Sequence, residues 1–173
     1  HMFGNHDSCT CLTLTIAPEH YEQFQTKAGM AFAMRAFIDR LRYYTPGRRS
    51  PKRFFISELG EDRGRLHFHG FIWDCNIPRR DLERSWRYGF ICARPLRSAK
   101  QLSYATKYIT KPAVDFHKPT IFVSPGLGLS YCNQERWRSW HKKGNANDPL
   151  NLYCKFDSFV YAMPRYYRSK IFT

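Results

Sequence analysis

The sequence has few acidic side chains and no segment suited to crossing a membrane. It carries 14 Asp and Glu residues against 28 Lys and Arg residues, which leaves a formal net charge of +14. No apolar run approaches the roughly 20 residues of a membrane-spanning helix, and no segment has the pattern of a secretory signal peptide. A membrane-embedded protein is therefore not expected. The excess positive charge indicates a polyanionic partner, in the first place a nucleic acid and in the second an anionic membrane surface.

The cysteines form no C-x-x-C pair, so the sequence suggests neither a zinc ribbon nor a thioredoxin-type redox motif. Their spacing is scattered, and several fall in apparent strands, where a reduced cysteine acts as a small hydrophobe. This pattern favours a reducing, cytoplasmic compartment. The six residues are Cys9, Cys11, Cys75, Cys92, Cys132 and Cys154.

Internal repeats, low-complexity segments and a clear linker are also absent. With 173 residues, 43% of them hydrophobic and 17% aromatic, the chain can bury a sizeable core and is not disordered. His1-Met2 resembles a remnant of an expression tag. We therefore predict one domain over residues 3–173, in which 112–173 form a C-terminal extension whose structure the pattern does not define.

Hydrophobic periodicity predicts the order strand, helix, strand, strand, helix, strand, helix, followed by mixed elements. Two consecutive strands joined by a hairpin between helical segments indicate an α+β fold, with a central antiparallel β-sheet and flanking helices packed mainly on one face. The predicted strands lie within 9–18, 53–60, 65–74, 88–96, 120–124 and 151–163. The predicted helices run from Pro18 to about Tyr44 and cover 78–87, 98–111 and, less regularly, 131–143.

The predicted hairpin carries two histidines one residue apart, His67 and His69, which share one strand face. With Asp62-Arg63 at the tip, Glu58 lies opposite His67 and diagonal to His69. Two imidazoles and a carboxylate can form part of the coordination shell of a divalent cation. The alternative is that two strand histidines at this spacing are a coincidence. Surface or loop positions are expected for the other histidines, which are His1, His6, His20, His117 and His141.

The predicted helix over 98–111 repeats the pattern Tyr-x-x-Lys. Tyr104 and Tyr108 share a helix face, and Lys107 and Lys111 repeat the same offset beside them. A tyrosine can form a covalent ester with phosphorus, and a lysine one turn away can offset the negative charge. The alternative is that both tyrosines pack in the core while the lysines are solvated.

Basic side chains concentrate in "RRSPKR", in the 78–87 helix and in "RWRSWHKK". Such residues can contact nucleic-acid phosphates, although arginines on helices are often plain solvated surface. The predicted DNA-binding residues are Arg48, Arg49, Lys52, Arg53, Arg79, Arg80, Arg136 and Arg138. Unpaired bases could stack on tryptophans unless these pack in the core. The candidates are Trp137 and Trp140, and, if exposed, Trp73 and Trp86.

As an ordered set, these motifs resemble the HUH endonuclease superfamily, and within it the replication initiators (Rep) of the Microviridae, small single-stranded DNA bacteriophages. "LHFHGF" resembles the histidine–hydrophobic–histidine motif, "SYATKYITK" the tyrosine helix of the two-tyrosine initiators, and "CLTLTI" the first-strand motif. "SELGEDRGRLHFH" places an acidic residue nine positions before the first histidine, as related viral initiators do. "MPRYYRSKIF" is also similar to this group. The resemblance covers most of 9–111.

The resemblance implies an HUH/RRM-like, ferredoxin-like sandwich and a metal-dependent rolling-circle replication initiator that nicks and rejoins single-stranded DNA at a phage origin. It implies Tyr104 and Tyr108 as nucleophiles, which form a 5′-phosphotyrosine intermediate and leave a free 3′-OH. Glu58, His67 and His69 would hold Mg²⁺ or Mn²⁺. Host helicase and polymerase are expected partners, and the host bacterial cytoplasm is the expected location.

Two other functions fit parts of the sequence. A non-catalytic single-stranded nucleic-acid-binding module with an RRM-like sheet explains the charge and the aromatic strands, but not the grouping of Glu58 with the two histidines. Another HUH enzyme, a transposase or plasmid relaxase, explains the histidines. The doubled Tyr-x-x-Lys pattern favours a phage-type initiator over these.

Overall fold

The structure is a computed structural model that describes residues 9–60, 64–73, 76–97, 119–142, 153–156, 159–163 and 165–172. The chain divides into two compact units, one within Phe3–Ser124 and the other within Pro125–Thr173. Each unit is described by itself. The boundary predicted at residue 112 lies outside the described residues.

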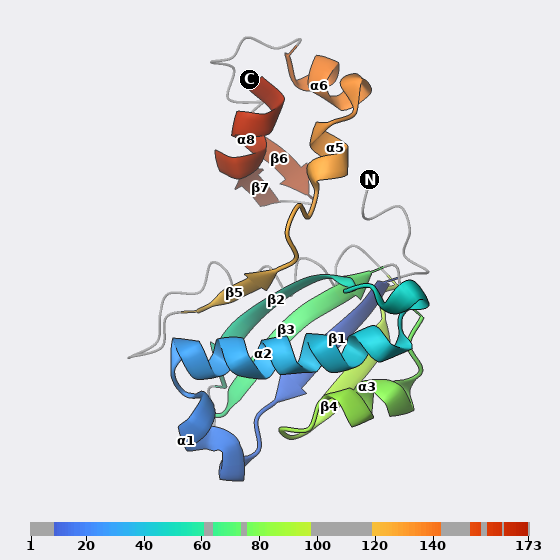
Figure 1. The fold of residues 1–173 in the computed structure, drawn as a ribbon. Helices are drawn as coiled ribbons and strands as arrows, with labels where there is room; N and C mark the ends of the chain where they lie inside the picture. Colours follow the sequence, from blue (N-terminus) through green and yellow to red (C-terminus); the bar gives the residue numbers. More distant parts are fainter. Residues whose placement is uncertain are drawn as a thin grey trace. The chain divides into compact units, whose positions relative to one another are not determined.

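The first unit is built on a five-stranded antiparallel sheet with the order β4-β1-β3-β2-β5. The histidine strand, β3, therefore lies in the middle of the sheet, between β1 and β2. Helices flank this sheet (Figure 1), which confirms the predicted α+β fold. The strands are β1 (Cys9–Thr15), β2 (Lys52–Leu59), β3 (Leu66–Trp73), β4 (Ile91–Pro95) and β5 (Ile121–Val123).

Two helices, α2 (Lys27–Leu41) and α3 (Arg79–Ser85), lie against the same face of the sheet (Figure 1). A short helix, α1 (Tyr21–Phe24), precedes α2. Short 3₁₀ helices are η2 (Pro18–His20), η3 (Arg42–Tyr44) and η4 (Pro46–Arg48). The helix and strand predicted over 78–87 and 88–96 are thus found, with shorter bounds.

The single long helix predicted from Pro18 to Tyr44 is wrong, because the chain breaks between α1 and α2. Thr26 has an extended backbone, and its hydroxyl accepts a hydrogen bond of 3.0 Å from the backbone N–H of Gly29. This N-cap starts a new helix. Gly29 also allows the two helices to pack closely, because a Cβ there would lie only 2.2 Å from the backbone oxygen of Gln23.

The face beneath α2 and α3 carries the hydrophobic core, as the alternation in β1 predicts. Trp86 is 2% exposed and packs its ring edge-on against Phe37, with centroids 5.5 Å apart. Trp73 on the other face is 6% exposed. Both tryptophans are therefore buried, so the exposure that base stacking would require is not met, and the alternative that they pack in the core holds for both. The strand residues of the core are Leu12, Leu14, Phe55, Leu66, Phe68, Ile72 and Ile91.

The described residues of the second unit form a two-stranded antiparallel ribbon and three short helices. The ribbon joins β6 (Tyr153–Phe156) to β7 (Phe159–Ala162), and the helices are α5 (Leu129–Cys132), α6 (Glu135–Lys142) and α8 (Arg165–Phe172). The surface role predicted for His141 is wrong. This residue is 6% exposed, and one ring nitrogen lies 3.0 Å from the hydroxyl of Tyr131.

Within the ranges that the structure describes, no helix combines the length and apolar character needed to cross a bilayer. Cys11, Cys92 and Cys132 are free thiols. Burial raises the pKa of the Cys11 and Cys132 thiols above the ordinary value, so both favour the protonated form.

Candidate functional site

The hairpin between β2 and β3 has the register that the sequence predicts. Glu58 pairs directly with His67. The turn is closed by hydrogen bonds from Gly60 N–H to Arg65 and from Gly64 N–H to Gly60, of 2.8 and 2.9 Å. Gly64 has a positive φ of 57°, a conformation that glycine adopts without steric cost. Because strand side chains alternate, this register brings the Glu58 carboxylate and both imidazoles to the sheet face opposite α2.

Strand β1 adds two threonines to the same face. Thr13 pairs with His69, and Thr15 pairs with His67. Their hydroxyl oxygens lie 3.2 and 3.0 Å from the Nδ1 atoms of the paired histidines. Each imidazole is thereby held through Nδ1, and its Nε2 atom is the nitrogen left to meet a carboxylate, a metal ion or substrate.

The Glu58 carboxylate contacts His69, the diagonal histidine. Its Oε2 atom lies 3.1 Å from Nε2 of His69, and the two side chains are 15% and 17% exposed. The rings of His67 and His69 have centroids 6.0 Å apart. A partly buried carboxylate beside two imidazoles thus forms a compact polar patch on the middle of the sheet.

The environment of His67 favours its neutral form. Burial lowers the pKa of the imidazole from its ordinary value, Glu58 opposes that shift, and Arg65 adds to it. The neutral imidazole is the form that binds metal ions or accepts a proton. Nε2 of His67 lies over the hairpin, since a Cβ added to Gly60 would be 3.1 Å from that atom.

The residue types of the patch suit a divalent cation, but the side chains are not gathered around one point. Among the described residues, no three His, Cys, Asp or Glu side chains form a group that could hold a metal ion. Two imidazoles anchored through Nδ1 and one carboxylate are nevertheless a donor set that Mn²⁺ accepts. Mg²⁺ would bind mainly through the carboxylate oxygen. Metal binding by Glu58, His67 and His69 stays a prediction.

Thr15 is fixed from several sides. Its backbone N–H donates to Phe90 at 2.8 Å, and its carbonyl accepts from the indole N–H of Trp86 at 3.0 Å. The buried tryptophan therefore supports the residue that holds His67. The sequence alone did not reveal the role of Thr13 and Thr15, because the pairing of β1 with β3 is not encoded in either strand alone.

The predicted nucleophile segment, with Tyr104, Lys107, Tyr108 and Lys111, lies outside the described residues. Of the predicted DNA-binding residues, Arg48 and Arg49 lie in the connection from α2 into β2, Lys52 and Arg53 are the first residues of β2, and Arg79 and Arg80 lie on α3. Arg79 is paired with Glu83 at 2.8 Å. Arg136 and Arg138 lie on α6 of the second unit, and the side chains of Trp137 and Trp140 are outside the described set.

Comparison with known proteins identifies the family. A sequence-family model described as replication-associated protein ORF2/gene 2 protein matches residues 9–113. The match spans more than half of the chain, including β1 to β4, the histidine pair and the Tyr-x-x-Lys segment, so the chain belongs to this family. No curated protein and no solved structure matches the chain significantly. Family membership associates the protein with replication and is consistent with a rolling-circle initiator.

Proposed function

We propose that the protein is an HUH-type initiator of rolling-circle replication, of the kind found in Microviridae, which nicks and rejoins single-stranded origin DNA. Support comes from the replication-associated family, whose match includes both tyrosines. The observation that carries the proposal is the contact of Glu58 with His69, 3.1 Å, beside His67 on one sheet face. A patch with these groups serves phosphoryl transfer better than plain nucleic-acid binding.

The reaction assigned to the tyrosines is a transesterification. The phenolic oxygen of Tyr104 or Tyr108 forms a bond to phosphorus, and the bond from phosphorus to the 3′ oxygen breaks. That oxygen takes up a proton and leaves as a free 3′-OH, while the 5′ side of the break stays on the enzyme as a phosphotyrosine. The second tyrosine cleaves the regenerated origin. The freed 3′-OH then attacks the first ester, which closes the DNA and releases the phenol.

Lys107 and Lys111 are assigned to the charge that develops on the phenolate and on phosphorus. Glu58, His67 and His69 would hold Mg²⁺ or Mn²⁺, which when bound supplies a Lewis acid that polarises a phosphate oxygen. In this scheme the threonine hydroxyls of β1 keep both imidazoles turned with Nε2 toward the substrate. The burial of His67 keeps that ring neutral.

The net charge of +14 provides the attraction for the DNA backbone. The basic residues within 48–53, on α3 and on α6 are proposed to contact phosphates. Host helicase and polymerase are the proposed partners, because a nicked strand must be unwound and extended from the 3′-OH. These steps place the protein in the host bacterial cytoplasm.

The non-catalytic alternative requires aromatic side chains exposed on the sheet for base stacking. Phe71 and Trp73, on the same face as the histidines, are only 2% and 6% exposed. The aromatic platform of an RRM-like module is therefore not offered by these two residues, which favours the catalytic proposal.

A covalent-adduct assay tests the proposal. The wild-type protein, incubated with labelled single-stranded origin DNA and Mn²⁺, should yield a protein–DNA adduct that maps to Tyr104 or Tyr108. Substituting both by Phe should abolish it, whereas the matched control Tyr166→Phe, an exposed tyrosine on α8, should retain it. An adduct of undiminished yield in the double variant would remove the tyrosines from the account.

A further inference from the structure

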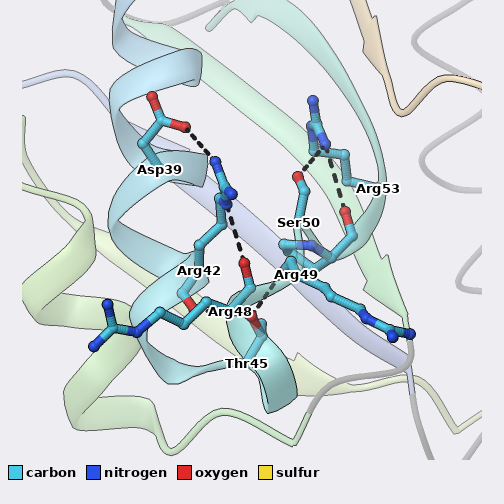
Figure 2. Close-up of polar contacts among 8 residues, drawn as sticks. Asp39, Arg42, Thr45, Arg48, Arg49, Ser50 and Arg53 are labelled. Carbon is cyan, nitrogen blue, oxygen red and sulfur yellow. Dashed lines mark hydrogen bonds and ion pairs between the residues drawn. The ribbon is translucent and has the colours of Figure 1, made fainter.

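A hollow of about 400 Å³ lies where α2 gives way to the connection into β2, and it is lined by Asp39, Arg42, Tyr43 and Arg48. Figure 2 shows the polar contacts beside it, with the side chains of Arg42 and Asp39 directed toward each other. The volume falls in the range of small-ligand sites. Sequence reasoning singled out Arg48 as a phosphate contact, and the other three lining residues have no role in the proposed reaction.

The backbone around the hollow is held in an unusual conformation. Gly47 and Arg48 have consecutive positive φ angles of 62° and 52°. Among the residues that the structure describes, Arg48 is the one non-glycine residue with a positive φ. The turn is fixed by Thr45, whose hydroxyl donates to the carbonyls of Arg42 and Arg49, and by the Arg42 guanidinium, which donates to the carbonyl of Arg48 at 3.2 Å. A strained residue held this way is a sign of function.

This conformation places the Arg48 guanidinium 5.3 Å from the ring centroid of Tyr43. Tyr43 remains 70% exposed, so most of its ring is open to solvent. The hollow therefore combines two guanidinium groups, an exposed aromatic ring and the Asp39 carboxylate, which lies 3.9 Å from Arg42 and is 61% exposed. These are the groups that recognise a phosphate, a base plane and a base amino group, respectively.

We propose that this hollow binds one unpaired nucleotide of single-stranded DNA. The phosphate lies against Arg42 and Arg48, the base stacks on Tyr43, and Asp39 accepts a hydrogen bond from an exocyclic amino group. Inorganic phosphate explains neither the aromatic ring nor the carboxylate. An anionic membrane surface gains nothing from Asp39, which repels it.

The nucleotide site is separate from the histidine patch. Arg53, held to Ser50 by a hydrogen bond of 3.0 Å beside the connection (Figure 2), lies five residues before Glu58 on β2. That separation is roughly 17 Å along the strand, and the odd spacing places the two residues on opposite faces. A stacked strand covers this distance in about five nucleotides. The inference rests on the proposed function only for the identity of the ligand as DNA, and it concerns binding rather than cleavage.

Equilibrium binding of labelled single-stranded DNA, measured in EDTA against salt concentration, tests the site without any cleavage. Losing one phosphate contact should make the slope of log K against log salt shallower by about 0.7. Arg42→Gln combined with Arg48→Gly should show this change. The matched control Lys27→Gln removes a charge at the opposite end of α2 and should leave the slope near the wild-type value. Arg48→Gly also removes the strained φ, so its melting temperature should not fall.

Base recognition gives a second readout. Tyr43→Ala should weaken binding at least fivefold, and Tyr43→Phe should keep it, because stacking requires only the ring. Oligo-dC should bind about fivefold more tightly than oligo-dT, which lacks an exocyclic amino group, and Asp39→Ala should remove this preference. Both Tyr43 and Asp39 are exposed, so these variants carry the test even if Arg42→Gln lowers stability.

Three results would overturn the proposal. The first is an unchanged salt slope in the double arginine variant, and the second is an unchanged affinity of Tyr43→Ala for single-stranded DNA. The third is that the variants bind DNA as the wild type does and lose only their binding to phosphatidylserine vesicles. The last result would make the hollow a membrane contact. The proposed nicking activity is tested separately, because the absence of a covalent adduct would not change the results of these binding measurements. If both proposals hold, the variants should impair nicking of long substrates but not of oligonucleotides that end within about five nucleotides of the scissile bond.

Discussion

Replacing Thr15 by valine removes the hydroxyl that lies 3.0 Å from Nδ1 of His67 and keeps the branched shape of the side chain. The imidazole is half-buried, so its Nδ1 loses a partner that water replaces poorly. The loss of one such hydrogen bond costs about 1 kcal/mol of folding stability. For a domain of this size, that corresponds to a fall of about 4 °C in the melting temperature.

The effect on the proposed metal should be larger than the effect on stability. A metal ion on Nε2 requires the proton of the neutral ring on Nδ1, where Thr15 would accept it. Removal of a hydrogen-bond partner of a metal-binding histidine typically lowers metal affinity by about 10- to 100-fold. Titration calorimetry with Mn²⁺ should show this loss in Thr15→Val, whereas Thr15→Ser, which keeps a hydroxyl, should bind nearly as the wild type does. Nitrogen chemical shifts of His67 should show a fixed tautomer in the wild type and a mixture in the valine variant. Equal Mn²⁺ affinity and an unchanged tautomer in Thr15→Val would refute the positioning role of the threonine.

Three further predictions concern the same patch. Gly60→Ala should lower the nicking rate by about 10- to 100-fold in a steady-state assay, with little change in melting temperature. The reason is that the added Cβ would lie 3.1 Å from Nε2 of His67 and displace the ring. A wild-type nicking rate in this variant would show that the ring tolerates the methyl group. Glu58→Gln should weaken Mn²⁺ binding, measured by calorimetry, at least tenfold through loss of a charged ligand, and wild-type affinity would exclude Glu58 from the metal set. The lowered pKa of His67 means that the unfolded chain takes up this proton more readily than the folded chain. The stability present above the unfolded pKa, about 6.5, should therefore be lost as the pH falls through the folded pKa. Denaturant titrations at several pH values should show this dependence weakened in His67→Gln, and an identical pH profile in that variant would count against the shift.

The site hairpin was predictable because its information is local. Alternation in 53–60 and 65–74 predicts which side chains share a face, and a hairpin tip expected at Asp62-Arg63 predicts the register. The observed pairing of Glu58 with His67 agrees with that register. The direct contact of Glu58 with His69 was not predictable, since it depends on how the ring is anchored. Those anchors, Thr13 and Thr15, come from a strand more than 50 residues earlier in the chain.

The helix break at Thr26 shows where hydrophobic periodicity fails to predict structure. Apolar residues recur at helical spacing through 24–37, so a continuous helix was the natural prediction. The N-cap at Thr26 and the close approach at Gly29 override that pattern, because a capping hydrogen bond and a tight helix contact are local geometric choices. The nucleotide hollow was missed for a similar reason. The turn at Gly47-Arg48 folds an arginine back onto Tyr43, a contact that composition does not reveal.

Nicking by a variant that lacks both histidines tests the central claim most directly. His67→Ala combined with His69→Ala removes both imidazoles from the central strand and leaves the basic residues within 48–53 intact. With labelled origin DNA and Mn²⁺, this variant should bind DNA within a fewfold of the wild type and form no phosphotyrosine adduct. The wild type should likewise form none in EDTA. Adduct formation at the wild-type rate by the folded double variant, or by the wild type in EDTA, would contradict the claim that the histidine patch and its metal carry out the chemistry.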